Sequence, residues 1–117
     1  MVVTALAVGA AALAATALPA PAGSARAARI RAVHVPGSPV VGKRLFKGSG
    51  CGSCHTLEPA GTTGTVGPNL DRYEPPYGLI VTQVAHGGGG MPAFGRRLSK
   101  AQIEDIAAFV FKWTSRP

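Results

Sequence analysis

Two cysteines and the histidine that follows them are the residues best suited to chemistry in this 117-residue chain. Cys51 and Cys54 are its only cysteines, Gly52 and Ser53 separate them, and His55 follows directly. The pattern Cys-x-x-Cys-His is the attachment motif of c-type haem. Two thiols at this spacing can reach both vinyl groups on one edge of a porphyrin, and the adjacent imidazole becomes an iron ligand. The motif therefore predicts one haem c, covalently attached through both cysteines.

Three alternatives compete with haem attachment at these residues. A structural zinc site needs four ligands, usually with a second Cys or His pair, and the sequence has no such pair. A thioredoxin-like dithiol belongs to a βαβ unit, and no run of residues alternates as a strand would. Chance occurrence is the third alternative. A disulfide across so short a loop would constrain little, so we expect the pair to serve chemistry.

Short helices are expected to position these residues. The stretch 40–47 predicts a helix in which Gly42 and Phe46 share one face. The stretch 77–85 predicts a second helix. Glycines and prolines make 58–76 and 87–90 loops.

The last helix has the clearest signals. Ser99 with Gln102 three residues on forms a capping box, which predicts a helix start. Apolar residues then recur at helical spacing, namely Ile103, Ile106, Phe109, Val110 and Trp113. The predicted class is all-α, a few helices and long loops that need something central to pack around.

The composition divides the chain into three parts. Residues 1–27 combine a run of about 17 apolar or small residues with small-residue cleavage sites, which predicts a signal peptide, although no Lys or Arg precedes the run. A retained membrane anchor is the alternative, because such a run is just long enough to span, and a buried Ala-rich helix is a third possibility. Residues 28–39 form an irregular leader, and 40–117 form the predicted haem domain. We therefore expect an exported protein in the periplasm or another extracytoplasmic space, free or membrane-anchored.

Motifs in the same order identify a family resemblance over residues 40–113. The sequence resembles the class I cytochromes c, particularly their short bacterial monohaem members, which implies the class I cytochrome c fold. After the haem motif, GPNL at 67–70 is similar to the family's Gly-Pro-x-Leu. The resemblance implies that the Pro68 carbonyl accepts a hydrogen bond from the proximal His55 and that Leu70 packs on the haem ring.

Two further segments extend the resemblance. GMPAF at 90–94 is similar to the family's sixth-ligand segment, which makes Met91 the distal iron ligand opposite His55. Gly42 and Phe46, together with Phe109, resemble the family's contact between the first and last helices.

His/Met ligation has a functional consequence. A thioether is a soft ligand that favours Fe(II), so it raises the reduction potential, and two filled axial positions favour electron transfer over catalysis. Met91 as a core residue, or His86 or His34 as the sixth ligand, are the alternatives. Tyr73, Tyr77 and Trp113 could reach the haem propionates, with core packing as the simpler interpretation.

The basic residues suggest partners. The net charge is +7. Six cations flank the two haem-contacting segments: Lys43, Arg44, Lys47, Arg96, Arg97 and Lys100. They form either a solvated face or a docking surface for acidic redox partner proteins. No nucleic-acid-binding pattern is present in the sequence.

These observations predict an electron-transfer protein rather than an enzyme. It carries single electrons between partners outside the cytoplasm. The alternative is a dedicated haem c subunit of a larger dehydrogenase or terminal oxidase. A haem enzyme or gas sensor would require Met91 not to bind iron.

Overall fold

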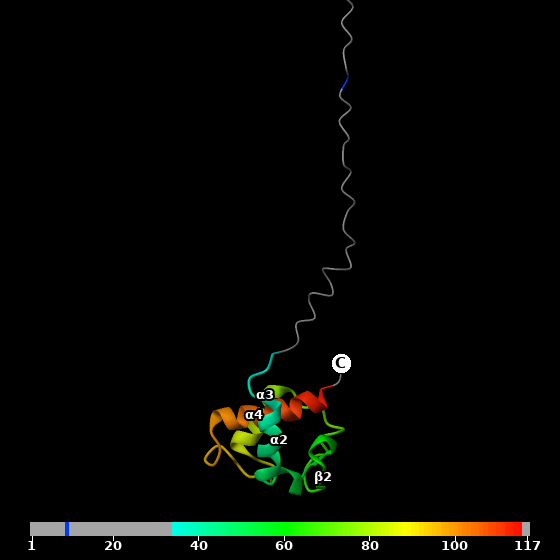
Figure 1. The fold of residues 1–117 in the computed structure, drawn as a ribbon. Coiled ribbons are helices and arrows are strands. Elements are labelled where there is room, and N and C mark those ends of the chain that lie inside the picture. The colour runs from blue at the N-terminus through cyan, green and yellow to red at the C-terminus, as the bar shows by residue number, and fades with distance from the viewer. Residues whose placement is uncertain (1–8, 10–33, 116–117) are drawn as a thin grey trace, which may run out of the picture. The chain divides into compact units, whose positions relative to one another are not determined.

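Short helices enclose one hydrophobic core in the computed structural model, which describes Gly9 and residues 34–115 (Figure 1). The α-helices in this part of the chain are α2 (Pro39–Gly48), α3 (Tyr77–His86) and α4 (Lys100–Thr114). Between α2 and α3 lie two 3-10 turns and two short strands: η1 (Cys51–Ser53), β1 (Thr56–Leu57), η2 (Glu58–Ala60) and β2 (Thr62–Thr63). The predicted all-α class is confirmed. The expected signal peptide or anchor over 1–27, Gly9 apart, and the start of the leader lie outside the described residues.

The helix starts follow local signals in the sequence. The Ser38 hydroxyl accepts a hydrogen bond from the backbone amide of Val41 at 3.4 Å, and Pro39 supplies a preset φ in the first turn of α2. At α4 the Ser99 hydroxyl accepts from the Gln102 amide at 3.2 Å, while the Gln102 side chain accepts from the Ser99 amide at 2.9 Å. The predicted capping box is therefore confirmed.

Helices α2 and α4 cross at the position that the resemblance implies. A Cβ atom on Gly42 would overlap the backbone carbonyl of Asp105 and the Cβ of Phe109, so a glycine is required there. The Phe46 and Phe109 rings meet edge to face, with centroids 5.7 Å apart, and both are almost fully buried. The close approach of backbones brings the two ends of the domain together.

The sequence analysis missed the short strands. Thr56 pairs with Thr63 and Leu57 with Thr62 in one antiparallel ladder. Two residues per strand are too few for an alternating pattern to show in the sequence. The ladder nevertheless places the fully buried Leu57 in the core and closes the loop that follows the cysteines.

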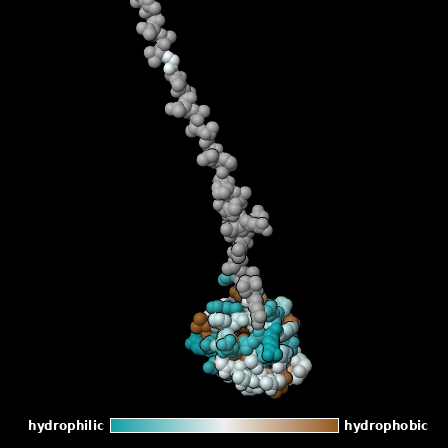
Figure 2. Space-filling view, turned by 90° about the vertical axis from the view of Figure 1, so that its right-hand side faces the viewer, coloured by the Kyte–Doolittle hydropathy of each residue, from teal (hydrophilic) through white to brown (hydrophobic). Residues whose placement is uncertain are grey.

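The face of the domain in Figure 2 is mostly polar. Figure 2 shows hydrophilic residues over much of the face turned to the viewer, with hydrophobic residues in small separate patches. No helix within the described residues combines the length and the apolar character needed to cross a membrane.

Candidate cofactor site

A cavity of about 520 Å³ lies between the cysteine turn, the 66–75 loop, α3, the 88–97 segment and α4. Its volume is in the range of small-molecule and cofactor sites. All six residues singled out in the sequence line it: Cys51, Cys54, His55, Pro68, Leu70 and Met91. The structure thus brings together residues that lie up to 40 positions apart in the chain, from Cys51 to Met91.

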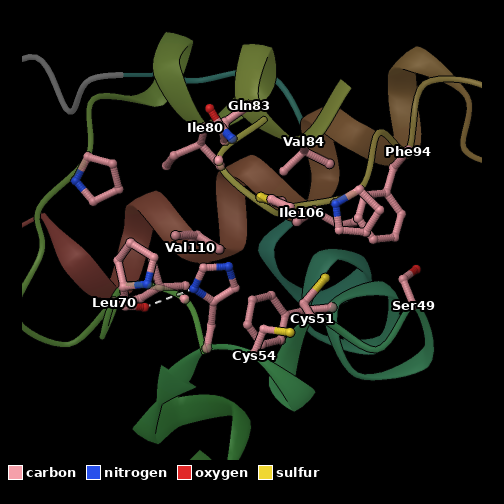
Figure 3. Close-up of a pocket in the computed structure, with 18 of the residues that line it drawn as sticks. Ser49, Cys51, Cys54, Leu70, Ile80, Gln83, Val84, Phe94, Ile106 and Val110 are labelled. Carbon is pink, nitrogen blue, oxygen red and sulfur yellow. Dashed lines mark hydrogen bonds between the residues drawn. The ribbon is translucent and has the colours of Figure 1, made fainter. Parts of the chain in front are cut away.

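The cysteine turn presents two free thiols to the cavity. Gly50 turns the chain with a φ of 80°, and the amides of Cys54 and His55 both bond to the Cys51 carbonyl, at 3.2 and 3.0 Å. In Figure 3 the sulfur atoms of Cys51 and Cys54 lie on the same side of the cavity, across from α3. This arrangement fits the addition of both thiols to one edge of a planar ring.

The protonation of Cys51 weighs against a redox-active dithiol. Burial raises the pKa of the Cys51 thiol to about 11, the Cys54 charge adds to the rise, and a backbone hydrogen bond opposes it. The thiol is therefore protonated at neutral pH, whereas a reactive Cys-x-x-Cys pair needs a lowered pKa. In the described residues no group of three or more His, Cys, Asp or Glu could hold a metal ion.

The His55 ring is oriented by a backbone carbonyl. Its Nδ1 lies 2.8 Å from the Pro68 carbonyl oxygen. A carbonyl can only accept, so Nδ1 carries the proton and Nε2 keeps its lone pair for a metal. This is the hydrogen bond that the resemblance implies, and such a bond fixes both the tautomer and the ring orientation of a ligand histidine.

The loop that supplies Pro68 is wrapped tightly around the cysteine turn. The Gly67 amide donates to the Cys54 carbonyl at 2.7 Å, and the Leu70 amide donates to the Thr56 carbonyl at 2.9 Å. A Cβ atom on Gly67 would come within 2.6 Å of the His55 Cε1, so glycine allows the chain to pass against the ring.

The Met91 side of the cavity is held by backbone pairs. Gly88 and Met91 exchange backbone hydrogen bonds of 2.9 and 3.1 Å, and the Gln83 side-chain amide donates to the Gly88 carbonyl at 3.1 Å. Phe94 and Gly95 then donate to carbonyls near the end of α3, at 2.9 and 3.0 Å. The segment after Met91 is thereby tied to α3.

The remaining walls are apolar, and the sequence analysis did not assign them. Ile80 and Val84 of α3 line the cavity together with Ile106 and Val110 of α4 (Figure 3). Gln83 and Arg97 also line it. The helical spacing of Ile106 and Val110 marks a buried stripe, but a stripe alone does not reveal whether it packs on protein or on a cofactor.

Of the other predicted candidates, only Tyr73 lines the cavity. His86 and His34 are exposed and do not line the cavity, so neither is placed to be the sixth ligand. The Tyr77 hydroxyl donates to the Pro36 carbonyl at 2.9 Å, and Tyr73 lines the cavity. The prediction that Trp113 packs in the core is wrong, because its side chain is 52% exposed and does not line the cavity.

Comparisons with known proteins agree with this geometry. A family model described as cytochrome c oxidase, cbb3-type, subunit III matches residues 38–110. Cytochrome c6 of Aphanizomenon flos-aquae is 58% identical over 33 residues, 28% of this chain and 38% of that protein. Cytochrome c6 of Gloeothece citriformis is 36% identical over 77 residues, 61% of this chain and 67% of that protein. The matched stretch thus covers between about a third and two thirds of these relatives.

A solved structure is similar over most of its length. The c-type cytochrome SorU of Sinorhizobium meliloti has a TM-score of 0.60 at 36% identity, covering 63% of this chain and 87% of that chain. The chain belongs to the cytochrome c family, as one of its small monohaem class I members. Its cofactor is covalently bound haem c, which supplies a one-electron Fe(III)/Fe(II) couple.

Proposed function

We propose that this protein is a monohaem electron carrier in which Cys51 and Cys54 hold the haem covalently. The observation that carries the proposal is a cavity with both free thiols at one edge, an oriented imidazole and a thioether. Each thiol would add its S–H across one vinyl double bond, the hydrogen passing to a vinyl carbon. No atom leaves in this addition, so two thioethers form without an oxidant.

In this proposal His55 and Met91 would hold the haem iron. The Pro68 carbonyl holds the His55 ring so that Nε2 is the ligand atom. The Met91 thioether favours the reduced iron and raises the potential. Leu70 and the apolar residues of α3 and α4 exclude water. With both of these side chains bound to the iron, the site would be suited to electron transfer rather than to binding a substrate.

A mobile carrier fits the surface better than a dedicated subunit. The hydrophobic patches on the face in Figure 2 are small and separate, whereas a permanent interface is larger and more apolar. Five large hydrophobic residues are exposed in the described part of the chain. Val66, Tyr73 and Leu79 line the cofactor cavity, whereas Val40 and Trp113 lie outside it. The relatives named cytochrome c6 also favour the carrier.

Acidic redox proteins are the proposed partners. Of the six predicted docking cations, Arg97 lines the cofactor cavity, where its guanidinium lies 4.6 Å from the centre of the Phe94 ring. Positive charge there would speed encounter with an acidic surface. We also propose export through residues 1–27, with work in the periplasm or another extracytoplasmic space.

Spectra and rates test the proposal together. The purified protein should show oxidised and reduced haem c spectra with His/Met ligation, and it should exchange electrons with ferricyanide. Electron transfer to an acidic redox protein should slow as salt rises, because screening acts over about 8–10 Å at physiological ionic strength. Absence of covalent haem would overturn the proposal of an electron carrier. A rate of electron transfer independent of salt would overturn the proposal of an acidic partner.

A further inference from the structure

A second groove, of about 540 Å³, lies between α3, the 93–98 loop and the start of α4. Its apolar lining includes Val81 and Ala85 of α3, Leu98 of the loop and Ile103 of α4. None of these four residues lines the cofactor cavity. The groove is therefore a separate feature with its own chemistry.

One chain segment forms a wall of both sites. Its residues divide between them: Met91, Pro92, Phe94 and Arg97 line the cofactor cavity, and Ala93, Gly95, Arg96 and Leu98 line the groove. The neighbours Arg96 and Arg97 thus belong to different sites. Anything seated in the groove would lie against the outer side of the segment that carries Met91.

The groove is rimmed by basic side chains. Arg96 and Lys100 line it together with His86, whose Nδ1 bonds to the Thr82 carbonyl at 3.1 Å and leaves Nε2 available. The Lys100 ammonium pairs with Glu104 at 2.8 Å, yet its side chain is 86% exposed. An apolar floor under a cationic rim is complementary to a segment that carries both apolar side chains and carboxylates.

We propose that this groove docks an acidic, partly apolar segment of a redox partner protein, an inference that rests on the proposed carrier function. The site favours a protein segment over a membrane because its apolar residues line a hollow. Insertion into a bilayer would need apolar side chains that project. The Lys100–Glu104 pair sets the strength of docking, because Glu104 competes with the partner's carboxylate for Lys100.

Nuclear magnetic resonance of the reduced holoprotein tests the groove directly. The probe is a synthetic peptide of alternating Glu and Leu, with a poly-Glu peptide of equal charge as its control. We expect the Glu-Leu peptide to shift the amide signals of Val81, Ala85 and Leu98, and poly-Glu to bind about tenfold more weakly. Equal binding of the two peptides, or shifts that avoid the groove, would overturn the proposal.

Four variants distinguish a segment seated in the groove from general electrostatic attraction. Arg96→Glu should weaken peptide binding about tenfold, against less than about twofold for Lys112→Glu, which makes the same charge change outside the groove. Glu104→Gln should tighten binding by about two- to fivefold by releasing Lys100. Ala93→Lys adds a positive charge but fills the groove, so binding should weaken. If it tightens instead, attraction is merely electrostatic and the proposal fails.

Two controls identify which idea fails. The first control replaces the peptide with vesicles of anionic phospholipid or with a second copy of the chain. If either one shifts the groove signals and the peptide does not, the proposal of a protein partner in the groove is overturned. Electron exchange with ferricyanide reports the carrier function without the groove. Wild-type protein that exchanges electrons normally but does not bind the Glu-Leu peptide in the groove refutes the docking inference alone. Loss of electron exchange in the wild-type protein refutes the carrier function.

Discussion

The two ligand-bearing walls of the cofactor cavity use glycine for different physical reasons. On the His55 wall, a Cβ atom on Gly64 or Gly67 would collide at 2.6 Å with the cysteine turn or the imidazole. On the Met91 wall, Gly89 and Gly90 have nothing within 4 Å of such an atom, but their φ angles are +62° and +90°. Added volume is therefore the constraint at Gly64 and Gly67, and backbone conformation is the constraint at Gly89 and Gly90. Gly87, at the start of the Met91 segment, is subject to both, because its φ is +68° and a Cβ atom there would lie 2.5 Å from the Met91 carbonyl oxygen.

The walls also differ in how they are held. The His55 wall combines the proposed thioethers with hydrogen bonds between the 64–70 loop and the cysteine turn, including that from Thr56 Oγ1 to the Gly64 carbonyl at 2.8 Å. The Met91 wall depends on backbone pairs with α3 and on Gln83. On the proposed assignment, one wall would hold the cofactor through covalent bonds, and the other would supply a ligand, Met91, that can be removed without losing the cofactor.

Removal of both thiols should have the largest effect, because it should abolish covalent haem attachment. Cys51→Ala with Cys54→Ala leaves no thioether, so haem should be lost on acid-acetone extraction. Met91→Ala is the matched change on the other wall and should retain covalent haem. Intact mass under denaturing conditions measures both. Haem that stays bound to the double alanine variant would contradict the assignment of the cysteines.

Loss of the proposed sixth ligand, Met91, should have the second-largest effect, on the spectrum and the reduction potential. In Met91→Ala the weak absorption of the iron–thioether bond in the oxidised protein should disappear, and the reduction potential should fall, because a soft ligand no longer favours Fe(II). Optical spectra and voltammetry report the two changes. Persistence of the absorption band would place the thioether ligand elsewhere.

A larger side chain on the His55 wall should lower the free energy of unfolding by about 1–3 kcal/mol. Gly67→Ala puts a methyl group against the imidazole and should displace it from the Pro68 carbonyl. Gly78→Ala in α3 is the control, because nothing lies within 4 Å of that position and Ala suits a helix. Thermal unfolding of both holoproteins makes the comparison, and equal stability would remove the proposed steric reason for Gly67.

Backbone strain on the Met91 wall should give the smallest effect. Gly89→Ala should cost about 1 kcal/mol, since a Cβ is disfavoured at a positive φ. Gly89→Asn should recover part of that loss, because Asn tolerates the left-handed region. Thermal unfolding again measures the difference. If Asn is no better than Ala at this position, side-chain contacts and not φ decide the requirement for glycine.

Local chemistry was readable from the sequence by itself. The thiols and His55 lie within five consecutive residues, so the haem motif needs no knowledge of the fold. The capping box at Ser99 and the three helices were predicted because their signals act over one or two turns. The contact of Gly42 with Phe109, and the Pro68 carbonyl as the partner of His55, came from the family resemblance and are present.

The tertiary structure decided which residues share a space. His86 precedes the glycines beside Met91 in sequence, yet it lines the outer groove, and Trp113 lies outside the core although it continues the α4 stripe. The division of Arg96 and Arg97 between two sites has no sequence signal either. The positions of His86, Arg96 and Arg97 depend on how the 88–98 segment packs against α3 and the start of α4. Packing between distant segments leaves no periodic pattern along the chain.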